Sequence, residues 1–332
     1  MPNKIAVTGG TGFVGAHVVR KLVERGDIVR ALARPSSRLD NLNGLGVEVV
    51  LGDLNDLNSL KNAFNGCDSV LHVAADYRLW SKNPQDLYDS NVNGAKNVMA
   101  ACESVGASKI VYTSTVGALG IPTDGTSGNE ETPVSLADMV GHYKRSKFLA
   151  EQAVLEYVSE KKLPVVIVNP STPVGDLDIK PTPTGKMIVD FLNGKMPGYM
   201  DTGLNLVDVH DVAEGHLLAL DRGVVGRKYI LGNKNMSLQA ILQELATLTG
   251  RKAPKMKFPY SLAYAVSAID TAIEGTLLGK NPQIALESVK MTRKRMYFDA
   301  SRAVNELGFP QSSIADALAR AIDWFRKNGY AK

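Results

Sequence analysis

Residues 4–15 read KIAVTGGTGFVG, an apolar run that breaks into a glycine-rich turn. Ile5, Ala6 and Val7 are typical of a buried parallel strand. The turn satisfies both the G-x-x-G-x-x-G and the G-x-G-x-x-G spacing, and a helical pattern follows over residues 17–24. Glycines let the backbone approach a pyrophosphate closely, and the N-terminus of the next helix offers free N–H groups to it. The stretch therefore predicts a dinucleotide-binding turn, rather than an ordinary connection between a strand and a helix.

The second predicted strand, residues 28–33, ends where a cofactor-selecting residue is expected. About 20 residues past the glycines, an NAD-binding unit usually carries Asp or Glu for the ribose hydroxyl. This chain has Arg34 there, followed by Ser37 and Arg38. A guanidinium cannot accept a hydrogen bond, but it can donate two to a phosphate. The loop therefore favours NADP, with its additional phosphate, over NAD. The alternative is a basic loop that only faces solvent.

The composition of the 332-residue chain is that of an ordinary globular protein, with 44% hydrophobic and 22% charged residues. A net charge of +4 without a basic, aromatic stripe argues against a nucleic-acid partner. No apolar run reaches the about 18–20 residues that cross a bilayer. Cys67 and Cys102 lack the spacing of metal ligands, and a strand from residue 4 leaves no room for a signal peptide. We therefore expect a cytoplasmic protein without a transmembrane segment.

The first half of the sequence alternates between strand-like and helix-like segments. The segments are strands at 28–33, 47–51, 69–73, 109–113 and 165–168, and helices at 57–64, 87–105 and 143–159. This alternation predicts an α/β fold, a doubly wound parallel sheet of the Rossmann type. Ligands bind at the carboxyl ends of such strands, around one crevice. The residues at these ends are Gly9–Gly12, Arg34, Asp53, Ala74, Ala75, Ser114, Thr115, Pro170 and Ser171.

The character of the sequence changes after Pro170, where a stretch rich in Pro, Thr and Gly is typical of a loop. We expect a Rossmann domain over residues 1–170, with segments returning to it near 204–222. Residues 171–332 would form a smaller, mostly helical substrate-binding lobe. Its predicted elements are helices at 187–192 and 212–220 and strands at 205–209 and 228–231.

Residues 143–147, YKRSK, place a tyrosine and a lysine on one face of a predicted helix. A phenol has a pKa of about 10, and a nearby ammonium favours the phenolate. Lys147 could therefore tune Tyr143 for proton exchange with a carbonyl or an alcohol, and hold the nicotinamide ribose. The spacing is also common on solvated helices, but the dinucleotide turn upstream favours the catalytic interpretation.

A hydroxyl that polarises the substrate oxygen is expected from residues 113–115, TST, at the end of a predicted strand. The alternative for one or two of the three is a cap on free backbone groups.

These motifs together resemble the extended short-chain dehydrogenase/reductase superfamily over essentially the whole chain. The motifs are TGGTGFVG (8–15), GDL (52–54), HVAA (72–75), NVNG (91–94), TST (113–115) and YKRSK (143–147). The tail MYFDASRAVNELGF (296–309) is similar to the dihydroflavonol 4-reductase-like branch. Within that branch, HVAADYRLW (72–80), GHYKRSKFLAEQ (141–152) and VNPSTPVG (168–175) most closely resemble the hopanoid-associated sugar epimerase family.

The resemblance implies a role for each matching residue. Residues that would bind the pyrophosphate are Gly9, Gly12, Phe13, Val14 and Gly15. Residues that would meet the rest of the cofactor are Asp53 and Leu54 at the adenine, Ala74 and Ala75 along the crevice, and Pro170 and Ser171 near the nicotinamide. The catalytic set would be Tyr143 as acid–base, Lys147 as its partner and Thr115, with Ser114 beside it, as the hydroxyl. Asn91 would support the active site.

The chain departs from the superfamily at one position. Nucleotide-sugar epimerases usually carry an arginine that grips the diphosphate, where this chain has Leu204. Residues 293–295, RKR, could substitute for it, or they could form a solvated basic turn. The departure favours a smaller or more apolar substrate.

Several other residues have two interpretations. Asp76, Tyr77 and Trp80 follow a strand end and would line the substrate mouth, unless they belong to a plain surface loop. Residues 251–280 begin with basic residues and continue as an apolar helical stretch. They could contact a membrane surface, but interruptions by acidic residues favour a core or lid helix. The histidines have no metal-ligand spacing, so we expect no metal site.

The sequence thus predicts an NADP-dependent oxidoreductase that moves hydride between a nicotinamide and a carbonyl or secondary alcohol, with net reduction preferred. One alternative is an NAD(P)-dependent sugar epimerase or dehydratase associated with hopanoid biosynthesis. A second alternative is a non-catalytic dinucleotide sensor. The presence of Tyr143, Lys147 and the hydroxyls of residues 113–115 argues against it. The small-molecule substrate stays unidentified. The resemblance suggests a homodimer through residues 87–105 and 143–159.

Overall fold

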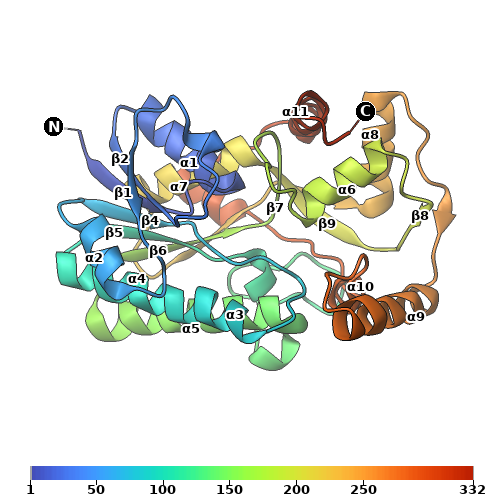
Figure 1. The fold of residues 1–332 in the computed structure, drawn as a ribbon, viewed down its shortest axis with the longest axis horizontal. Coiled ribbons are helices and arrows are strands. Elements are labelled where there is room, and N and C mark those ends of the chain that lie inside the picture. Colours follow the sequence, from blue (N-terminus) through green and yellow to red (C-terminus); the bar gives the residue numbers. More distant parts are fainter. Residues whose placement is uncertain (1, 332) are drawn as a thin grey trace.

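Seven parallel strands form the main sheet of the protein, whose computed structural model describes residues 2–331 (Figure 1). In sheet order they are β10 (Lys228–Leu231), β6 (Val165–Pro170), β5 (Lys109–Thr113), β4 (Ser69–His72), β1 (Lys4–Thr8), β2 (Ile28–Ala33) and β3 (Glu48–Leu51). The chain reverses its direction across the sheet between β1 and β4, and this is where doubly wound sheets bind ligands. The predicted fold class is confirmed.

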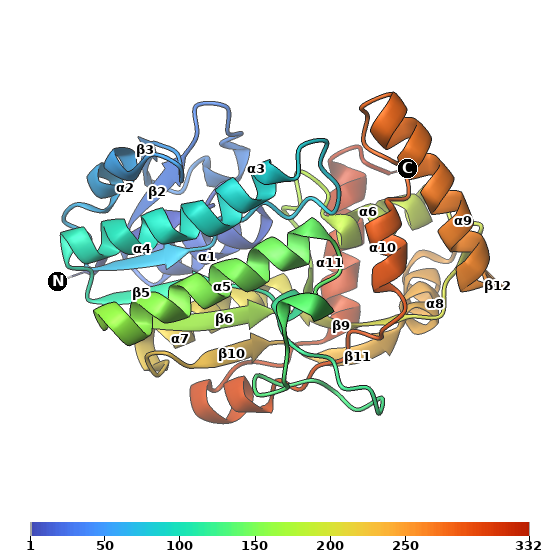
Figure 2. The same cartoon turned by 90° about the horizontal axis from the view of Figure 1, so that it is seen from below.

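Helices cover both faces of this sheet (Figures 1 and 2). One face carries α1 (Phe13–Glu24) and α7 (Val209–Arg222), which pack on each other. The other carries α2 (Leu57–Phe64), α4 (Gly94–Val105) and α5 (Gly141–Lys161). Each face has its own apolar core, because successive side chains along each strand point to opposite faces of the sheet.

The helix predicted over residues 87–105 is present, but it is built from three parts. They are α3 (Gln85–Tyr88), a π-helical turn η2 (Asp89–Asn93) and α4. The π-turn widens the helix at Asn91, and such turns are frequent at functional sites. The spacing of apolar residues does not reveal the one extra residue of a π-helical turn. The sequence therefore predicted an uninterrupted helix.

The remaining chain forms a second lobe with an apolar core of its own. A three-stranded sheet joins β7 (Thr172–Val174), β9 (Gly203–Asp208) and β11 (Lys234–Ser237), and a two-stranded one joins β8 (Gly198–Tyr199) and β12 (Met256–Lys257). The helices around them are α6 (Pro183–Leu192), α8 (Leu238–Thr249) and α11 (Ile314–Lys327). We did not predict β7, β8, β11 and β12, because these strands of two to four residues contain no apolar run such as the one that marks β10.

Three further elements lie on the rim of the second lobe (Figure 2). They are α9 (Tyr260–Asp270), the π-helical η5 (Thr271–Leu277) that continues it, and α10 (Leu286–Met291). Short helical turns η3 (Val116–Ala118), η4 (Leu136–Asp138) and η6 (Ala303–Leu307) complete the part of the chain used below. None of the helices within residues 2–331 combines the length and the apolarity needed to span a bilayer.

Candidate active site

The glycine-rich turn after β1 is a place where side chains cannot fit. Gly9 has φ +73°, and a Cβ there would lie 2.6 Å from the backbone nitrogen of Ala74. A Cβ on Gly15 would lie 2.1 Å from the carbonyl oxygen of Gly9. Gly12 donates its N–H to the same carbonyl at 3.0 Å and closes the turn. The predicted glycines therefore bring the start of α1 close against the end of β1, as a pyrophosphate cradle requires.

The start of α1 has features that favour binding of an anion. Gly12 is its N-cap residue and supplies no side-chain hydrogen bond, and its first turn contains no acidic residue. The positive end of the helix dipole and its first N–H groups therefore remain for an anion. Ser171, after β6, adds a hydroxyl oxygen that is buried without a partner among residues 2–331. Both features fit a bound dinucleotide, with Ser171 at the predicted nicotinamide end.

The loop after β2 presents two exposed arginines, Arg34 and Arg38. The Ser37 N–H donates to the Arg34 carbonyl at 2.9 Å, and the Arg34 N–H donates to the Ser37 hydroxyl at 3.1 Å, so the turn is fixed by its own residues. Arg38 donates to Asp40 at 3.0 Å, which partly neutralises its charge. Of the two predicted phosphate-binding arginines, Arg34 is therefore the better placed.

The predicted adenine and crevice residues lie at the ends of β3 and β4. Asp53 accepts a hydrogen bond from the Asn55 N–H at 2.9 Å, which orients its carboxylate. Leu54 packs beside Gly94 at the start of α4. Ala74 donates its N–H to the hydroxyl of Thr8 at 3.3 Å, which ties the end of β4 to that of β1. All of them belong to the same carboxyl edge of the sheet as the glycine turn.

Tyr143 lies in the first turn of α5, and two polar side chains fix that turn. Ser146 donates its hydroxyl to the Tyr143 carbonyl at 2.8 Å. Asn91 donates to Ser146 at 3.0 Å and to the carbonyl of Asp76 at 2.9 Å, and it accepts from the Asp76 N–H at 2.8 Å. The π-turn η2 thus connects the loop after β4 with the helix that carries the tyrosine, and Asn91 fits its predicted supporting role.

The phenol of Tyr143 is held in its protonated form. Burial raises its pKa above the usual value of 10.0, a hydrogen bond with the side chain of Thr115 lowers it, and the charge of Asp76 raises it again. Thr115 accepts the N–H of Gly117 at 3.0 Å, which leaves its own hydroxyl proton free to donate. Tyr143 therefore carries its proton at neutral pH, as a group that protonates a carbonyl oxygen must.

Lys147 is buried against β5 rather than bound to the phenol. Its Nζ donates to the Thr113 carbonyl at 2.9 Å and to the Tyr112 hydroxyl at 3.4 Å, and it lies 5.0 Å from the centre of the Tyr112 ring. Burial lowers its pKa to about 8. We expected the ammonium to favour the Tyr143 phenolate. In this structure the pKa of Tyr143 is raised instead, because the cost of burying the charged phenolate dominates.

Ser114 donates its proton into a buried network and not toward Tyr143. Its hydroxyl donates to Glu151 at 2.5 Å, and Asn169 donates to the same carboxylate oxygen at 2.9 Å. The other oxygen of Glu151 lies 2.6 Å from the Nζ of Lys228. A hydroxyl whose only proton is used in this way cannot donate to a substrate oxygen. Of the two predicted hydroxyls, the geometry therefore favours Thr115.

Glu151 itself was missed at the sequence level, although a signal existed. It lies one helical turn after Lys147 and two turns after Tyr143, on the same face of α5. Without coordinates, a fully buried carboxylate at this position could not be told from a solvated one.

The predicted mouth residues contact two segments of the second lobe. The Tyr77 hydroxyl donates to the carbonyl of Lys180 at 3.3 Å. Trp80 packs on η5, where a Cβ on Gly275 would lie 3.1 Å from the indole ring. The Asp76 carboxylate is 2.5 Å from Arg78. The loop after β4 thus joins the cofactor edge to the second lobe, as a substrate mouth would.

The position of Leu204 is apolar in the structure as well. Leu204 forms an isolated bridge with Met296, and the Nζ of Lys144 lies 3.7 Å from the Met296 sulfur. Two of the three basic residues that could have replaced a diphosphate-binding arginine are engaged elsewhere, since Arg293 lies over Tyr260 at 5.0 Å and Arg295 donates to Asp201 at 3.1 Å. Lys144 is a buried ammonium that the sequence did not single out, and burial lowers its pKa to about 8.

One cluster of histidines was also missed. His17 on α1 lies 3.0 Å from the carbonyl of Asp176, and His210 on α7 lies 2.9 Å from the Asp176 carboxylate. Their donor atoms lie within 4.8 Å of one another, so this group could hold a metal ion. The three residues come from distant parts of the chain, and sequence spacing cannot bring them together. Hydrogen bonds already account for the contacts, so the absence of a metal ligand stays a prediction.

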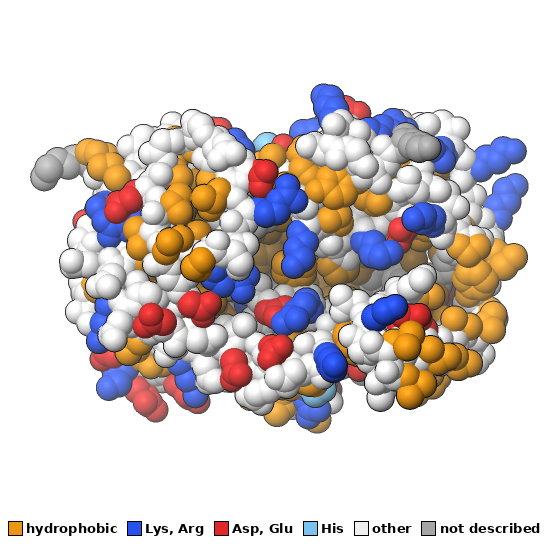
Figure 3. All heavy atoms as spheres, viewed as in Figure 1, with side chains coloured by type: hydrophobic (Ala, Val, Ile, Leu, Met, Phe, Trp, Pro, Cys, Tyr) orange, Lys and Arg blue, Asp and Glu red, His pale blue; other side chains and the backbone are white. Residues whose placement is uncertain are grey.

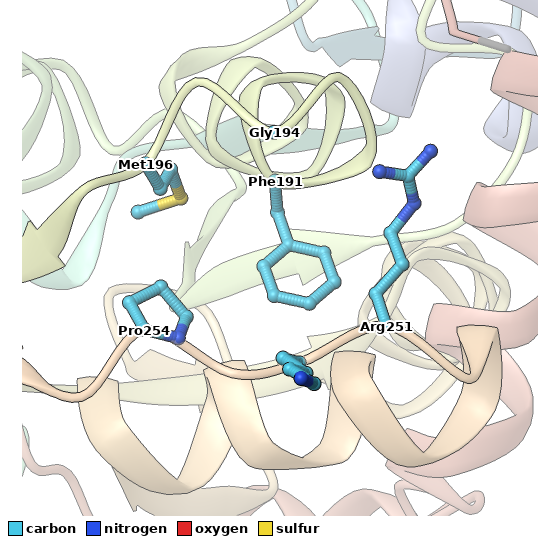
Figure 4. Close-up of a pocket in the computed structure, with 6 residues that line it drawn as sticks. Phe191, Gly194, Met196, Arg251 and Pro254 are labelled. Atoms are coloured by element: carbon cyan, nitrogen blue, oxygen red, sulfur yellow. The ribbon is translucent and has the colours of Figure 1, made fainter.

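A small hollow lies apart from these residues, between α6 and the segment after α8 (Figure 4). It has a volume of about 180 Å³, and the Phe191 ring points into it between Pro254 and Arg251. None of the predicted site residues lines it. It is too small for a dinucleotide, since ligand pockets usually measure roughly 300–1,000 Å³.

Together, the Rossmann sheet, the glycine cradle and the Tyr143–Lys147 pair beside Thr115 define a dinucleotide-dependent enzyme of the short-chain dehydrogenase/reductase type. Residues 5–232 match the model of the NAD dependent epimerase/dehydratase family. This protein belongs to that family and is an NAD(P)-dependent oxidoreductase.

Two relatives and one solved structure match nearly the whole chain. A Synechocystis protein named "Putative dihydroflavonol 4-reductase" is 49% identical over 98% of this chain and 95% of its own. Sterol demethylase protein B of Methylococcus capsulatus is 35% identical over 97% of this chain and 98% of its own. Among solved structures, that of gox2253 is similar with a TM-score of 0.89 and 46% identity, covering 99% of this chain and 100% of the other.

Proposed function

We propose that this protein is an NADP-dependent ketone reductase that acts on a bulky, weakly polar substrate. The observation that carries the proposal is the placement of the half-buried Tyr143 phenol next to the Thr115 side chain at the carboxyl edge of the sheet, beside the glycine cradle. A proton donor and a second hydroxyl donor beside a dinucleotide cradle are what carbonyl reduction requires.

When bound, the reduced nicotinamide supplies the hydride that the carbonyl carbon accepts. Tyr143 donates its phenolic proton to the carbonyl oxygen, and the proton is replaced from water. Thr115 donates a hydrogen bond to the same oxygen as its negative charge develops. Lys147 carries a positive charge one helical turn from Tyr143 on the same helix, because its pKa of about 8 leaves it mostly protonated at neutral pH. Asn91 and Ser146 hold the turn that carries Tyr143.

The preference for NADP rests on the loop after β2. Arg34 is exposed there, and Ser37 fixes its turn. A guanidinium at this position offers two donors to a phosphate and none of the acceptors that a ribose hydroxyl needs. Arg38 contributes less in this proposal, since Asp40 already binds it.

The apolar character of the substrate rests on the surroundings of the mouth. Leu204, which pairs with Met296 through the backbone, stands where a diphosphate-binding arginine would have been expected, and Trp80 is a predicted mouth residue. The names of the relatives, a dihydroflavonol reductase and a sterol demethylase protein, refer to substrates of this kind. We propose a bulky, weakly polar alcohol–ketone pair.

The proposal is tested with NADPH and two probe ketones, a dihydroflavonol and cholestanone. We expect NADPH consumption in step with alcohol formation for at least one of them. The variant Thr115→Val keeps the shape of the side chain and removes the donor, so it should lower kcat by about 10²-fold, while Thr115→Ser should restore most of it. Turnover of neither probe, or full activity of Thr115→Val, would contradict the proposed role.

Epimerisation is the second candidate, favoured by the family model itself. The same tyrosine and threonine would then act on an alcohol whose hydride returns to the same molecule. The two functions differ in one readout, because net reduction consumes NADPH and epimerisation does not. Interconversion of sugar epimers at constant NADPH would favour this candidate.

A further inference from the structure

The outer helix of the second lobe exposes an unusual number of large apolar side chains. Six of them lie along α9 and the following η5, and they are between 46% and 78% exposed. We call them the apolar ridge: Leu262, Val266, Ile269, Ile273, Leu277 and Leu278. Figure 2 shows this helix at the rim of the molecule, and Figure 3 shows apolar side chains gathered on the same side. Soluble proteins rarely leave such a contiguous surface to water unless it binds something.

The spacing of the ridge is that of a buried helix face. Residues 262, 266, 269 and 273 follow one another at intervals of four, three and four, which places them on a single stripe. Such a stripe normally packs against a core. Here the buried positions are Ser267 of α9 and Gly275 of η5, so the small residues face the protein and the large apolar ones face outward.

Basic residues border the ridge at its two ends, since Arg293 lies over the Tyr260 ring at the start of α9 and the Nζ of Lys82 lies beside Gly279 after η5. Residues 251–295 contain nine Lys and Arg and three Asp and Glu, whereas the whole chain has a net charge of only +4. Figure 3 shows basic side chains beside the apolar ones on this end of the molecule. One of the acidic residues, Asp270, accepts the N–H of Ile284 at 2.7 Å and therefore caps a loop instead of interrupting the stripe. Apolar and basic side chains together are what an anionic bilayer surface attracts.

The inner side of the ridge lies over the predicted mouth residue Trp80 and its neighbour Lys82. Gly275 packs on the Trp80 ring, and a Cβ on Gly279 would lie 3.1 Å from the Nζ of Lys82. The outer helix therefore covers the loop that carries the predicted mouth residues. A surface that met the ridge would lie next to this mouth.

We propose that the apolar ridge docks the protein on a membrane surface that contains anionic lipids. The helix lies in the plane of the interface, with its apolar stripe among the acyl chains and its basic neighbours at the headgroups. We had expected a core or lid helix here, and the contact with Trp80 still agrees with a lid. A second copy of this chain is a poorer occupant, because two such basic surfaces would repel each other across a symmetric interface. The inference goes beyond the proposed function and does not depend on it.

Co-sedimentation with vesicles tests the proposal. The full chain is mixed with phosphatidylcholine vesicles and with vesicles that also contain phosphatidylglycerol. We expect binding to the anionic vesicles that weakens as salt is added. The variant Ile269→Glu/Leu277→Glu places two charges on exposed positions, so it should fold normally and bind the anionic vesicles at least about tenfold more weakly. The matched control is Val224→Glu/Val225→Glu, which changes two exposed valines outside the ridge and should bind like the wild type.

Three outcomes would overturn the proposal. They are no binding to anionic vesicles, equal binding by the ridge variant, and an equal loss in the control variant. Sedimentation velocity without vesicles checks the competing occupant: a dimer that the ridge variant abolishes would assign the surface to a second copy. Unfolding midpoints of both variants, measured in urea, establish that a loss of binding is not a loss of fold.

Discussion

The carboxyl edge of the main sheet buries polar side chains, whereas the outer helix of the second lobe exposes apolar ones. At the sheet edge, charged and polar groups are buried and paired, as Glu151 is with Lys228, Ser114 and Asn169. On the outer helix, large apolar groups such as Ile269 and Leu277 are exposed. Both arrangements cost free energy in the isolated chain, and both are therefore places where a ligand or a surface is expected.

The difference also explains why the sheet edge could be predicted from the sequence and the exposure of the outer helix could not. The sheet edge depends on close backbone approach, which only glycine permits at positions such as Gly9 and Gly15. This constraint appears in the sequence as glycines at fixed spacing. The outer helix depends on something outside the chain, and its apolar spacing is the same whether the stripe is buried or exposed.

The largest expected effect separates chemistry from binding at the sheet edge. Tyr143→Phe removes the proton donor but keeps the ring, so kcat should fall by about 10²- to 10⁴-fold. NADPH affinity, measured by fluorescence titration, should stay within about twofold of the wild type, because the cradle around Gly9 is unchanged. Tyr157→Phe, a tyrosine further along α5, is the control and should keep full activity. Retained turnover in Tyr143→Phe would remove the basis of the proposed mechanism.

Much of the sheet edge could be predicted, and the reasons are specific. The strands 28–33, 109–113 and 228–231 and the helix 57–64 have the predicted bounds, because each is a short apolar or amphipathic run between turn residues. The partner of the Ser114 hydroxyl could not be predicted, since a hydroxyl rotates toward whichever acceptor the fold supplies. The contact of His17 and His210 with Asp176 could not be predicted either, as it joins elements that are distant in the chain.

The second prediction concerns the buried charges below the site. Lys228→Met leaves the carboxylate of Glu151 buried without its cation, which should lower the free energy of unfolding by about 3–5 kcal/mol in urea titrations. The double variant Lys228→Met/Glu151→Leu should recover most of this loss. Lys4→Met breaks a solvent-exposed pair with Glu48 and serves as control, with an expected change below about 1 kcal/mol. Equal effects of the two single variants would mean that the buried network contributes no more than a surface pair.

The third prediction concerns the loop between β7 and α6, which carries Asp178. Burial raises the pKa of Asp178 to about 6, against hydrogen bonds from Thr182 that lower it. The folded state thus binds the proton more tightly than the unfolded one. The contribution of Asp178 to the free energy of unfolding should therefore fall as the pH rises from about 4 to about 6, by up to about 3 kcal/mol.

The Asp178→Asn variant isolates this contribution. The amide oxygen can still accept from Thr182, and the group no longer titrates. Urea titrations across this pH range should show a flatter profile for the variant than for the wild type. Asp323→Asn, at an exposed position of α11, should leave the profile unchanged. Parallel profiles for the wild type and Asp178→Asn would show that this carboxyl does not titrate in the range.

The smallest effect should come from the exposed end of the sheet edge, where solvent weakens every charge. Arg34→Ala removes the proposed donors to the additional phosphate of NADP, so kcat/KM with NADPH should fall by about 10- to 100-fold. The value with NADH should hardly change, because NADH lacks that phosphate. Arg38→Ala is the matched control and should have the smaller effect, since Asp40 already binds Arg38. If both cofactors suffered equally, or if the wild type preferred NADH, Arg34 would be a solvated surface residue. Cofactor choice would then have to come from another part of the edge, such as the carboxylate of Asp53, which Asn55 orients.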